Sequence, residues 1–185
     1  MKKVYLIHGF EGSPNGGWRP YLMGELEKLD IYSCALPMPT PDKPIVSEWL
    51  SEIKHYIDRD INDEVYLVGH SLGGTTILHY LEQFNSPNIK GALIVSAPCT
   101  RTETNKRIWN FLETDFDWNL IKSRLNKIMV LHGDDDPLVP LSDAEKTSNE
   151  LNGELIIIPN GKHLNGSAGF IKLPEALSAV LKIIE

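Results

Sequence analysis

Cysteine is scarce in this sequence, and the kinds of protein that depend on it are excluded. Only Cys34 and Cys99 occur, in different segments and without the spacing of a metal site. Neither a disulfide framework nor a cysteine-ligated metal centre is therefore expected. A reducing cytoplasm is the natural setting for such a chain, and we interpret Cys99 as a packing residue.

Basic charge and long apolar runs are scarce as well. Lysine and arginine number 18 against 25 acidic residues, a formal net charge of −7 with no basic cluster, so no nucleic-acid partner is expected. Met1–Lys3 followed by Val4–Ile7 resembles the start of a signal peptide, but the apolar run is shorter than the roughly 7–15 residues such a peptide needs. No run approaches the about 20 apolar residues of a membrane span. We expect a cytoplasmic protein with no membrane attachment.

Short apolar runs recur along the chain, with helical patterns between most of them. The runs are Val4–Ile7, Ile31–Leu36, Val65–Val68, Ala92–Val95, Ile128–Leu131 and Leu155–Ile158. This alternation is typical of an α/β protein whose parallel strands are joined by right-handed crossovers. The 185 residues, 42% of them hydrophobic, are enough for one core and few for two, so we predict a single domain over 1–185.

The third run leads directly into the motif Gly-His-Ser-Leu-Gly, and a helix-compatible stretch follows. A serine at such a junction sits on a turn so tight that larger residues at Gly69 and Gly73 would clash. The turn exposes the hydroxyl near the first backbone N–H groups of the helix, which can bind a developing oxyanion. Ser71 is the candidate nucleophile, against the alternative that it only caps the helix.

A nucleophilic serine needs a base, and the base needs an acid that fixes its tautomer. On this kind of sheet the acid is expected after the serine, and the fifth run ends in Gly-Asp-Asp-Asp-Pro. We favour Asp136, because the pattern resembles the acid loop of α/β-hydrolases, in which the aspartate before the proline is the acid. That proline also restricts the backbone of Asp136 to extended conformations. We expect Asp134 to cap its own loop and Asp135 to be solvated.

Only one histidine, His163, follows Asp136 in the chain. It lies in a polar, glycine-bearing loop after the last apolar run, where a general base is expected at the carboxyl edge of a parallel sheet. His8 is the competing base, although it precedes the serine. The glycine-rich loop after the first run lets backbone approach a ligand, and we expect the N–H groups of Phe10 and Leu72 to form an oxyanion hole.

With these motifs the chain resembles the small α/β-hydrolases of the retinoblastoma-binding protein 9 / YdeN-like serine hydrolase family. Besides the serine motif, the resemblance rests on Trp18, Met38-Pro39, Trp49, Phe116-Asp117-Trp118, Asp135-Asp136-Pro137 and His163. It implies a three-layer fold whose six-stranded, mostly parallel sheet has the order 2-1-3-4-5-6, with helices on both faces. It also implies a triad of Ser71, Asp136 and His163. Lys162 departs from the family pattern, in which glycine is common before the histidine.

The resemblance also implies that the connection at about 98–126 lies above the serine as a short lid over the acyl pocket. Its four aromatic side chains would cover that pocket or, alternatively, anchor a helix on the sheet. We expect the pocket to be lined by His8, Gly9, His70, Trp109 and Trp118. A lid this short predicts a shallow pocket and a preference for small or medium acyl esters.

These features predict a serine hydrolase that cleaves such esters through an acyl-enzyme intermediate. The expected partner is a small-molecule acyl substrate, and no metal or organic cofactor is expected. Thioesterases, amidases and peptidases use the same triad, so the leaving group stays open. The alternative from another class is a binding protein that keeps the hydrolase fold with an idle triad.

Overall fold

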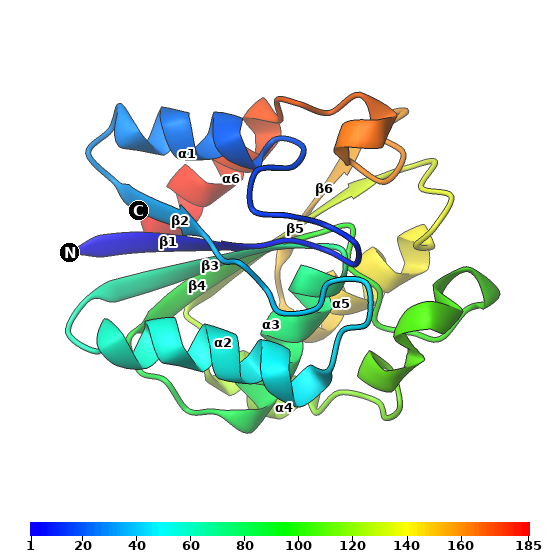
Figure 1. Cartoon of the computed structure of the whole chain (residues 1–185), viewed down its shortest axis with the longest axis horizontal. Helices are drawn as coiled ribbons and strands as arrows, with labels where there is room; N and C mark the ends of the chain where they lie inside the picture. The colour runs from blue at the N-terminus through cyan, green and yellow to red at the C-terminus, as the bar shows by residue number, and fades with distance from the viewer.

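The computed structural model describes residues 1–185 and contains one six-stranded sheet between two layers of helices (Figure 1). The strands are β1 (Lys2–Ile7), β2 (Tyr32–Ala35), β3 (Glu64–His70), β4 (Ile89–Val95), β5 (Lys127–Gly133) and β6 (Glu154–Ile158). They lie in the order β2-β1-β3-β4-β5-β6, and every neighbouring pair is parallel. The predicted α/β fold and strand order are confirmed, and the sheet is wholly rather than mostly parallel.

The helices divide between the two faces of the sheet. They are α1 (Arg19–Glu27), α2 (Val46–Arg59), α3 (Leu72–Gln83), α4 (Trp118–Ser123), α5 (Leu141–Leu151) and α6 (Pro174–Ile184), with 3-10 helices η1 (Glu103–Phe111) and η2 (Gly166–Ala168). Helices α1 and α6 pack on one face, and α2 to α5 pack on the other (Figure 1). No helix in the structure is both long and apolar enough to cross a membrane.

The alternation of side chains along each strand builds two separate cores. In β1, Val4 and Leu6 face the α1–α6 layer, whereas Tyr5 and Ile7 face the α2–α5 layer. Because both faces are covered, β1, β3, β4 and β5 are almost continuously buried, as expected for a parallel sheet. Because all six strands are parallel, the loops that leave the carboxyl ends of β1, β3, β5 and β6 meet at one edge of the sheet. This is the edge at which α/β proteins bind ligands.

The connection between β4 and β5 is fastened to the body of the protein by Asp143 of α5. This carboxylate, only 1% exposed, accepts hydrogen bonds from Cys99 N–H (2.8 Å), Thr100 N–H (3.1 Å) and Thr100 Oγ1–H (2.6 Å). Further along the connection, Phe111 and Phe116 are buried in the α2–α5 core. Its aromatic side chains therefore largely anchor the segment, which was the alternative left open by the sequence.

Candidate active site

Ser71 stands on the predicted turn between β3 and α3. Its φ of 54° and ψ of −125° are strained for a residue other than glycine, and its hydroxyl caps no helix N–H. A Cβ at Gly69 would lie 2.5 Å from Gly74 Cα, and one at Gly73 would lie 2.3 Å from the carbonyl oxygen of Ile7. The close packing of β1, β3 and α3 therefore requires glycine at both positions. The hydroxyl of Ser71 makes no hydrogen bond to the backbone of α3.

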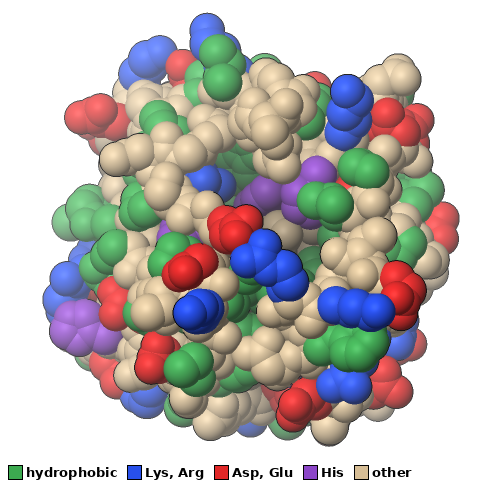
Figure 2. All heavy atoms as spheres, turned by 45° about the vertical axis from the view of Figure 1, so that its right-hand side comes forward, with side chains coloured by type: hydrophobic (Ala, Val, Ile, Leu, Met, Phe, Trp, Pro, Cys, Tyr) green, Lys and Arg blue, Asp and Glu red, His purple; other side chains and the backbone are tan.

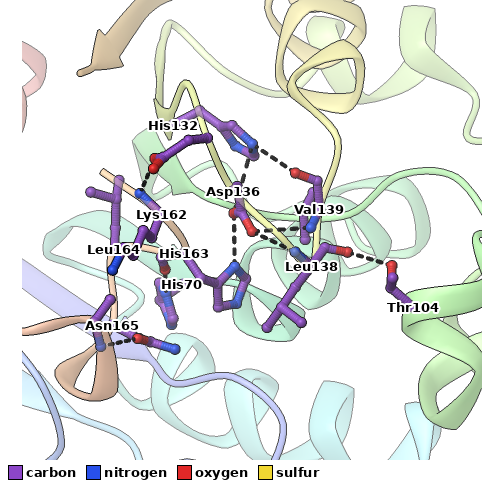
Figure 3. Close-up of polar contacts among 12 residues, drawn as sticks. His70, Thr104, His132, Asp136, Leu138, Val139, Lys162, His163, Leu164 and Asn165 are labelled. Carbon is purple, nitrogen blue, oxygen red and sulfur yellow. Dashed lines mark hydrogen bonds and ion pairs between the residues drawn. The ribbon is translucent and has the colours of Figure 1, made fainter. Parts of the chain in front are cut away.

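His163 and Asp136 lie side by side, although they come from different loops (Figure 3). His163 Nδ1 is 2.8 Å from Asp136 Oδ2, and the carboxylate side chain is fully buried. Asp136 Oδ1 accepts from the N–H groups of Leu138 (2.9 Å) and Val139 (3.1 Å), which fixes the carboxylate's orientation. Nδ1 must carry the proton in this contact, so Nε2 of His163 is left free to accept one.

The other two acidic residues of the loop behave differently from our expectation. Asp134 Oδ1 accepts from Asn160 N–H at 2.7 Å, and Asp135 Oδ1 accepts from Lys162 N–H at 2.6 Å. Asp134 therefore caps the histidine loop rather than its own, and that expectation was wrong because the hydrogen bond joins segments that are distant in the chain. Asp135 is exposed to solvent, as expected, but it also holds the histidine loop.

Three further histidines are buried near the candidate triad. His70 Nε2 donates to the backbone carbonyl of His163 at 2.9 Å, and burial holds the pKa of His70 well below its usual value. His132 Nε2 donates to the Val139 carbonyl at 3.1 Å and lies 3.7 Å from Asp136 Oδ2 (Figure 3). Burial also lowers the pKa of His132 and of His8. All three are neutral at pH 7 and act on the site through shape and hydrogen bonding.

Two backbone amides, those of Phe10 and Leu72, are the expected oxyanion donors. The N–H of Phe10 donates to no group in the protein, and the N–H of Leu72 opens α3, where helix amides lack partners. A Cβ at Gly9 would lie only 2.8 Å from Ser71 Cβ, so the loop after β1 packs directly against the serine. This geometry can support an oxyanion hole made by these two amides.

Two cavities meet at Ser71 and His163, which line both of them. The first, about 430 Å³, is polar and runs between the loop after β1 and the histidine loop; its lining includes Gly9, Ser13, Arg19, His70, Asn165 and Ser167. The second, about 280 Å³, runs toward η1; its lining includes Phe10, Pro98, Ile108, Leu138 and Val139. Figure 2 shows the hollow, with histidine and basic side chains inside it and charged side chains on its rim.

A hollow of about 540 Å³ lies elsewhere, at the start of β5 and β6, and contains none of the motif residues. Its lining includes Lys127, Glu154 and Lys182, which are surface charges. The volume of a cavity therefore does not identify the candidate active site. We identify it by the two cavities that contain Ser71.

Three of the residues expected in the pocket do not line either cavity at Ser71, whereas Gly9 and His70 do. Trp109 turns its indole N–H back into its own segment, to the Thr102 carbonyl (3.1 Å) and Asn105 Oδ1 (3.0 Å). Trp118 packs against Phe116 in the core. His8 is 1% exposed and is held by the neighbouring Gly9 carbonyl at 2.9 Å. Aromatic content alone did not reveal which side each ring would face.

The sheet, its helical layers and the turn that carries Ser71 define an α/β-hydrolase. The serine hydrolase family model matches residues 4–182. The chain therefore belongs to the serine hydrolase family, among the small members similar to RBBP9 and YdeN.

Two relatives illustrate this membership. YdeN of Bacillus subtilis (strain 168) is 29% identical over 174 residues, which cover 94% of this chain and 91% of YdeN. Serine hydrolase RBBP9 of Rattus norvegicus is 23% identical over 153 residues, covering 82% of this chain and 80% of RBBP9.

Solved structures agree on the fold. The crystal structure of the ydeN gene product from B. subtilis superimposes with a TM-score of 0.91 at 28% identity, covering 100% of this chain and 99% of that one. Est1E from Butyrivibrio proteoclasticus gives a TM-score of 0.78 at 18% identity over 99% of this chain and 88% of its own, a likeness of fold.

Proposed function

We propose that this protein is a carboxylic ester hydrolase that acts through Ser71, His163 and Asp136 with a covalent acyl-enzyme intermediate. The observation that carries the proposal is the 2.8 Å contact between His163 Nδ1 and the buried Asp136 carboxylate, at a histidine that shares its cavities with Ser71. A histidine oriented by a buried acid is the arrangement that activates a serine hydroxyl.

In the proposed reaction, His163 Nε2 takes the proton from Ser71 Oγ as Oγ bonds to the ester carbonyl carbon. The carbonyl electron pair moves to its oxygen, and the N–H groups of Phe10 and Leu72 stabilise that oxyanion. When the intermediate collapses, the C–O bond to the alcohol breaks and Nε2–H protonates the departing oxygen. Water then attacks the acyl-enzyme by the same steps and releases the acid and free Ser71. Asp136 stabilises the imidazolium that forms in each half.

The small apolar cavity supports a preference for small or medium acyl groups. It has about 280 Å³, and the segment at about 98–126 bounds it through Pro98 and Ile108. We assign this segment the role of a short lid. Asp143 pins its beginning, so the lid has little freedom to enlarge the cavity for a long chain.

The test is steady-state hydrolysis of p-nitrophenyl esters from acetate to palmitate by the parent protein and by Ser71→Ala. The proposal predicts kcat/KM that falls as the acyl chain lengthens beyond a few carbons, and a loss of at least about 10³-fold in Ser71→Ala. A maximum at long chains would contradict the acyl preference. Turnover unaffected by Ser71→Ala would contradict the mechanism.

The anilide of the best acyl group, measured in parallel, separates an ester hydrolase from an amidase. The proposal predicts that the ester is cleaved in preference to the anilide. We also place the activity in the cytoplasm, which the two free thiols of Cys34 and Cys99 support.

A further inference from the structure

Arg19 is a buried arginine in the polar cavity beside Ser71. It is the first residue of α1, is only 6% exposed and lines the same cavity as Ser71 and His163. Its Nε and Nη2 donate to the carbonyl oxygen of Ser13, at 3.2 and 2.8 Å. Its Nη1 makes no hydrogen bond within the protein and is not fully occluded. Part of the guanidinium is therefore available to a ligand in the cavity.

No carboxylate of the protein compensates this charge. Arg19 takes part in no ion pair, and burial alone lowers the pKa of its guanidinium to about 10, which leaves it cationic at neutral pH. The nearby side chains of His8 and His70 are neutral and buried. Glu11 also lines the cavity, but it is half-exposed on the rim and pairs with Arg107 at 2.7 Å. A buried cation without a counter-ion is costly, and an anionic ligand would remove that cost.

The surrounding backbone leaves room for the guanidinium. A Cβ at Gly16 would lie 2.8 Å from Arg19 Nη2, so glycine is needed there for the guanidinium to keep its position. The rest of this cavity is formed largely by glycine, serine and asparagine. The cavity toward η1 is largely apolar, and the one arginine that lines it, Arg107, is exposed and already paired with Glu11. The site thus has one polar arm with an unpaired buried cation and one largely apolar arm, with Ser71 between them.

We infer that the polar arm is an anion subsite, in which Arg19 binds a carboxylate carried by the substrate on one side of the scissile ester. The inference deepens the proposed function and rests on it for the identity of the scissile bond. Arginine suits this role because its planar fork of donors matches the geometry of a carboxylate. The substrate class is therefore an ester with an apolar group on one side and a carboxylate on the other.

The test compares esters that differ only in the anion. On the acyl side, mono-p-nitrophenyl glutarate is compared with p-nitrophenyl pentanoate; on the alcohol side, 4-carboxyphenyl acetate is compared with phenyl acetate. The inference predicts that in Arg19→Gln the anionic-to-neutral ratio of kcat/KM falls at least about 30-fold for one pair, mainly through KM. The neutral esters should lose much less activity than the anionic ones, because they place no anion against Arg19. Arg19→Lys, which keeps the charge, should retain part of the preference.

A matched control removes the same charge far from the site. Arg59 ends α2 and bonds to Tyr5 and Asp60 near the amino end of β1, so Arg59→Gln should leave both ratios unchanged within about twofold. Equal losses for anionic and neutral esters in Arg19→Gln would mean that Arg19 only holds the Ser13 loop, and would overturn the inference. Unchanged ratios in both pairs would overturn it as well.

A binding measurement keeps this test separate from catalysis. Calorimetric titration of glutarate into Ser71→Ala should give a measurable affinity that weakens at least about tenfold in the Ser71→Ala, Arg19→Gln double variant. Binding of this kind without ester turnover by the parent would reject the proposed function and keep the anion subsite. Turnover without an Arg19-dependent anion effect in either assay would keep the proposed function and reject the subsite.

Discussion

The carboxylate of Asp135 holds the backbone of Lys162, the residue directly before His163. Asp135 Oδ1 accepts from Lys162 N–H at 2.6 Å, although the two residues lie 27 positions apart. Lys162 has a φ of 46° and Leu164 a φ of 47°, so left-handed backbone flanks the histidine on both sides. Such backbone is strained for residues other than glycine and persists only where neighbouring groups hold it. Asp135 therefore positions the candidate base without touching it.

Removing the Asp135 carboxylate should loosen His163. We expect Asp135→Ala to lower kcat about 3- to 10-fold with little change in KM, because the base is less well oriented while the cavities are intact. Asp135→Asn, which keeps an acceptor oxygen but no charge, should restore most of the rate. Steady-state kinetics on a short-chain ester measures both. If kcat fell equally in the two variants, the effect would come from the lost charge rather than from the lost hydrogen bond, which would contradict the positioning role.

The turn at Ser71 should not tolerate a side chain at Gly73. A methyl group there would lie 2.3 Å from the carbonyl oxygen of Ile7 and 2.7 Å from that of His8, so β1 and α3 would have to separate. We expect Gly73→Ala to lower the free energy of unfolding by about 3 kcal/mol or more, as overpacking against backbone does at the upper end of its range. Urea titration measures this change.

Gly24 is the matched control for that substitution. It lies inside α1, and a Cβ there meets no atom within 4 Å. Gly24→Ala should therefore raise the free energy of unfolding by about 0.5–1 kcal/mol through helix propensity. If both alanine substitutions had the same effect, the close approach of β1 to α3 would be contradicted.

Acid should destabilise the protein through its buried neutral histidines. Burial lowers the folded-state pKa of His132 below 6.5, so as pH falls through 6.5 the unfolded chain takes up a proton that the folded protein excludes. This lowers the free energy of unfolding by up to about 1.4 kcal/mol per pH unit and has no effect well above pH 6.5.

His132→Gln isolates this contribution, because glutamine keeps a donor for the Val139 carbonyl but does not titrate. Urea titrations between pH 5 and 8 should show a shallower acid loss in the variant than in the parent protein. His8 and His70 remain in both proteins, so the difference between the two curves belongs to His132. Parallel curves would contradict a depressed pKa at this histidine.

Local patterns in the sequence were enough to predict the parallel strands and the turn at Ser71, whereas the order of the strands came from the resemblance to the family. Each apolar run has the length of a buried strand, and the requirement for Gly69 and Gly73 follows from the tightness of a strand-to-helix turn. Chain order also placed an acid and His163 at the same edge, because the carboxyl ends of parallel strands meet there. The choice of Asp136 over the two neighbouring aspartates came from the resemblance of its loop to the acid loop of α/β-hydrolases. These features depend on residues that are close in the chain or on the topology of the whole sheet.

Contacts between distant loops could not be predicted in this way. The carboxylates of Asp134 and Asp135 accept hydrogen bonds from backbone N–H groups of another loop. Every residue except proline has such an N–H group, so the residue types in the sequence do not identify the donors. The burial of Arg19 could not be predicted from the sequence either, since an arginine at the start of a helix is usually solvated. The ring directions of Trp109 and Trp118 depend on the path of an irregular segment, which composition does not define.

The most direct test of the account is labelling of the purified protein by a fluorophosphonate, with the modified residue mapped by mass spectrometry. The probe reacts with a serine whose hydroxyl is activated by a base, so the account predicts one label, on Ser71. Labelling should disappear in Ser71→Ala and slow by at least about 100-fold in His163→Ala, with both variants folded by circular dichroism. Absence of labelling in the folded parent, or labelling at an unchanged rate in His163→Ala, would contradict an active Ser71–His163–Asp136 triad.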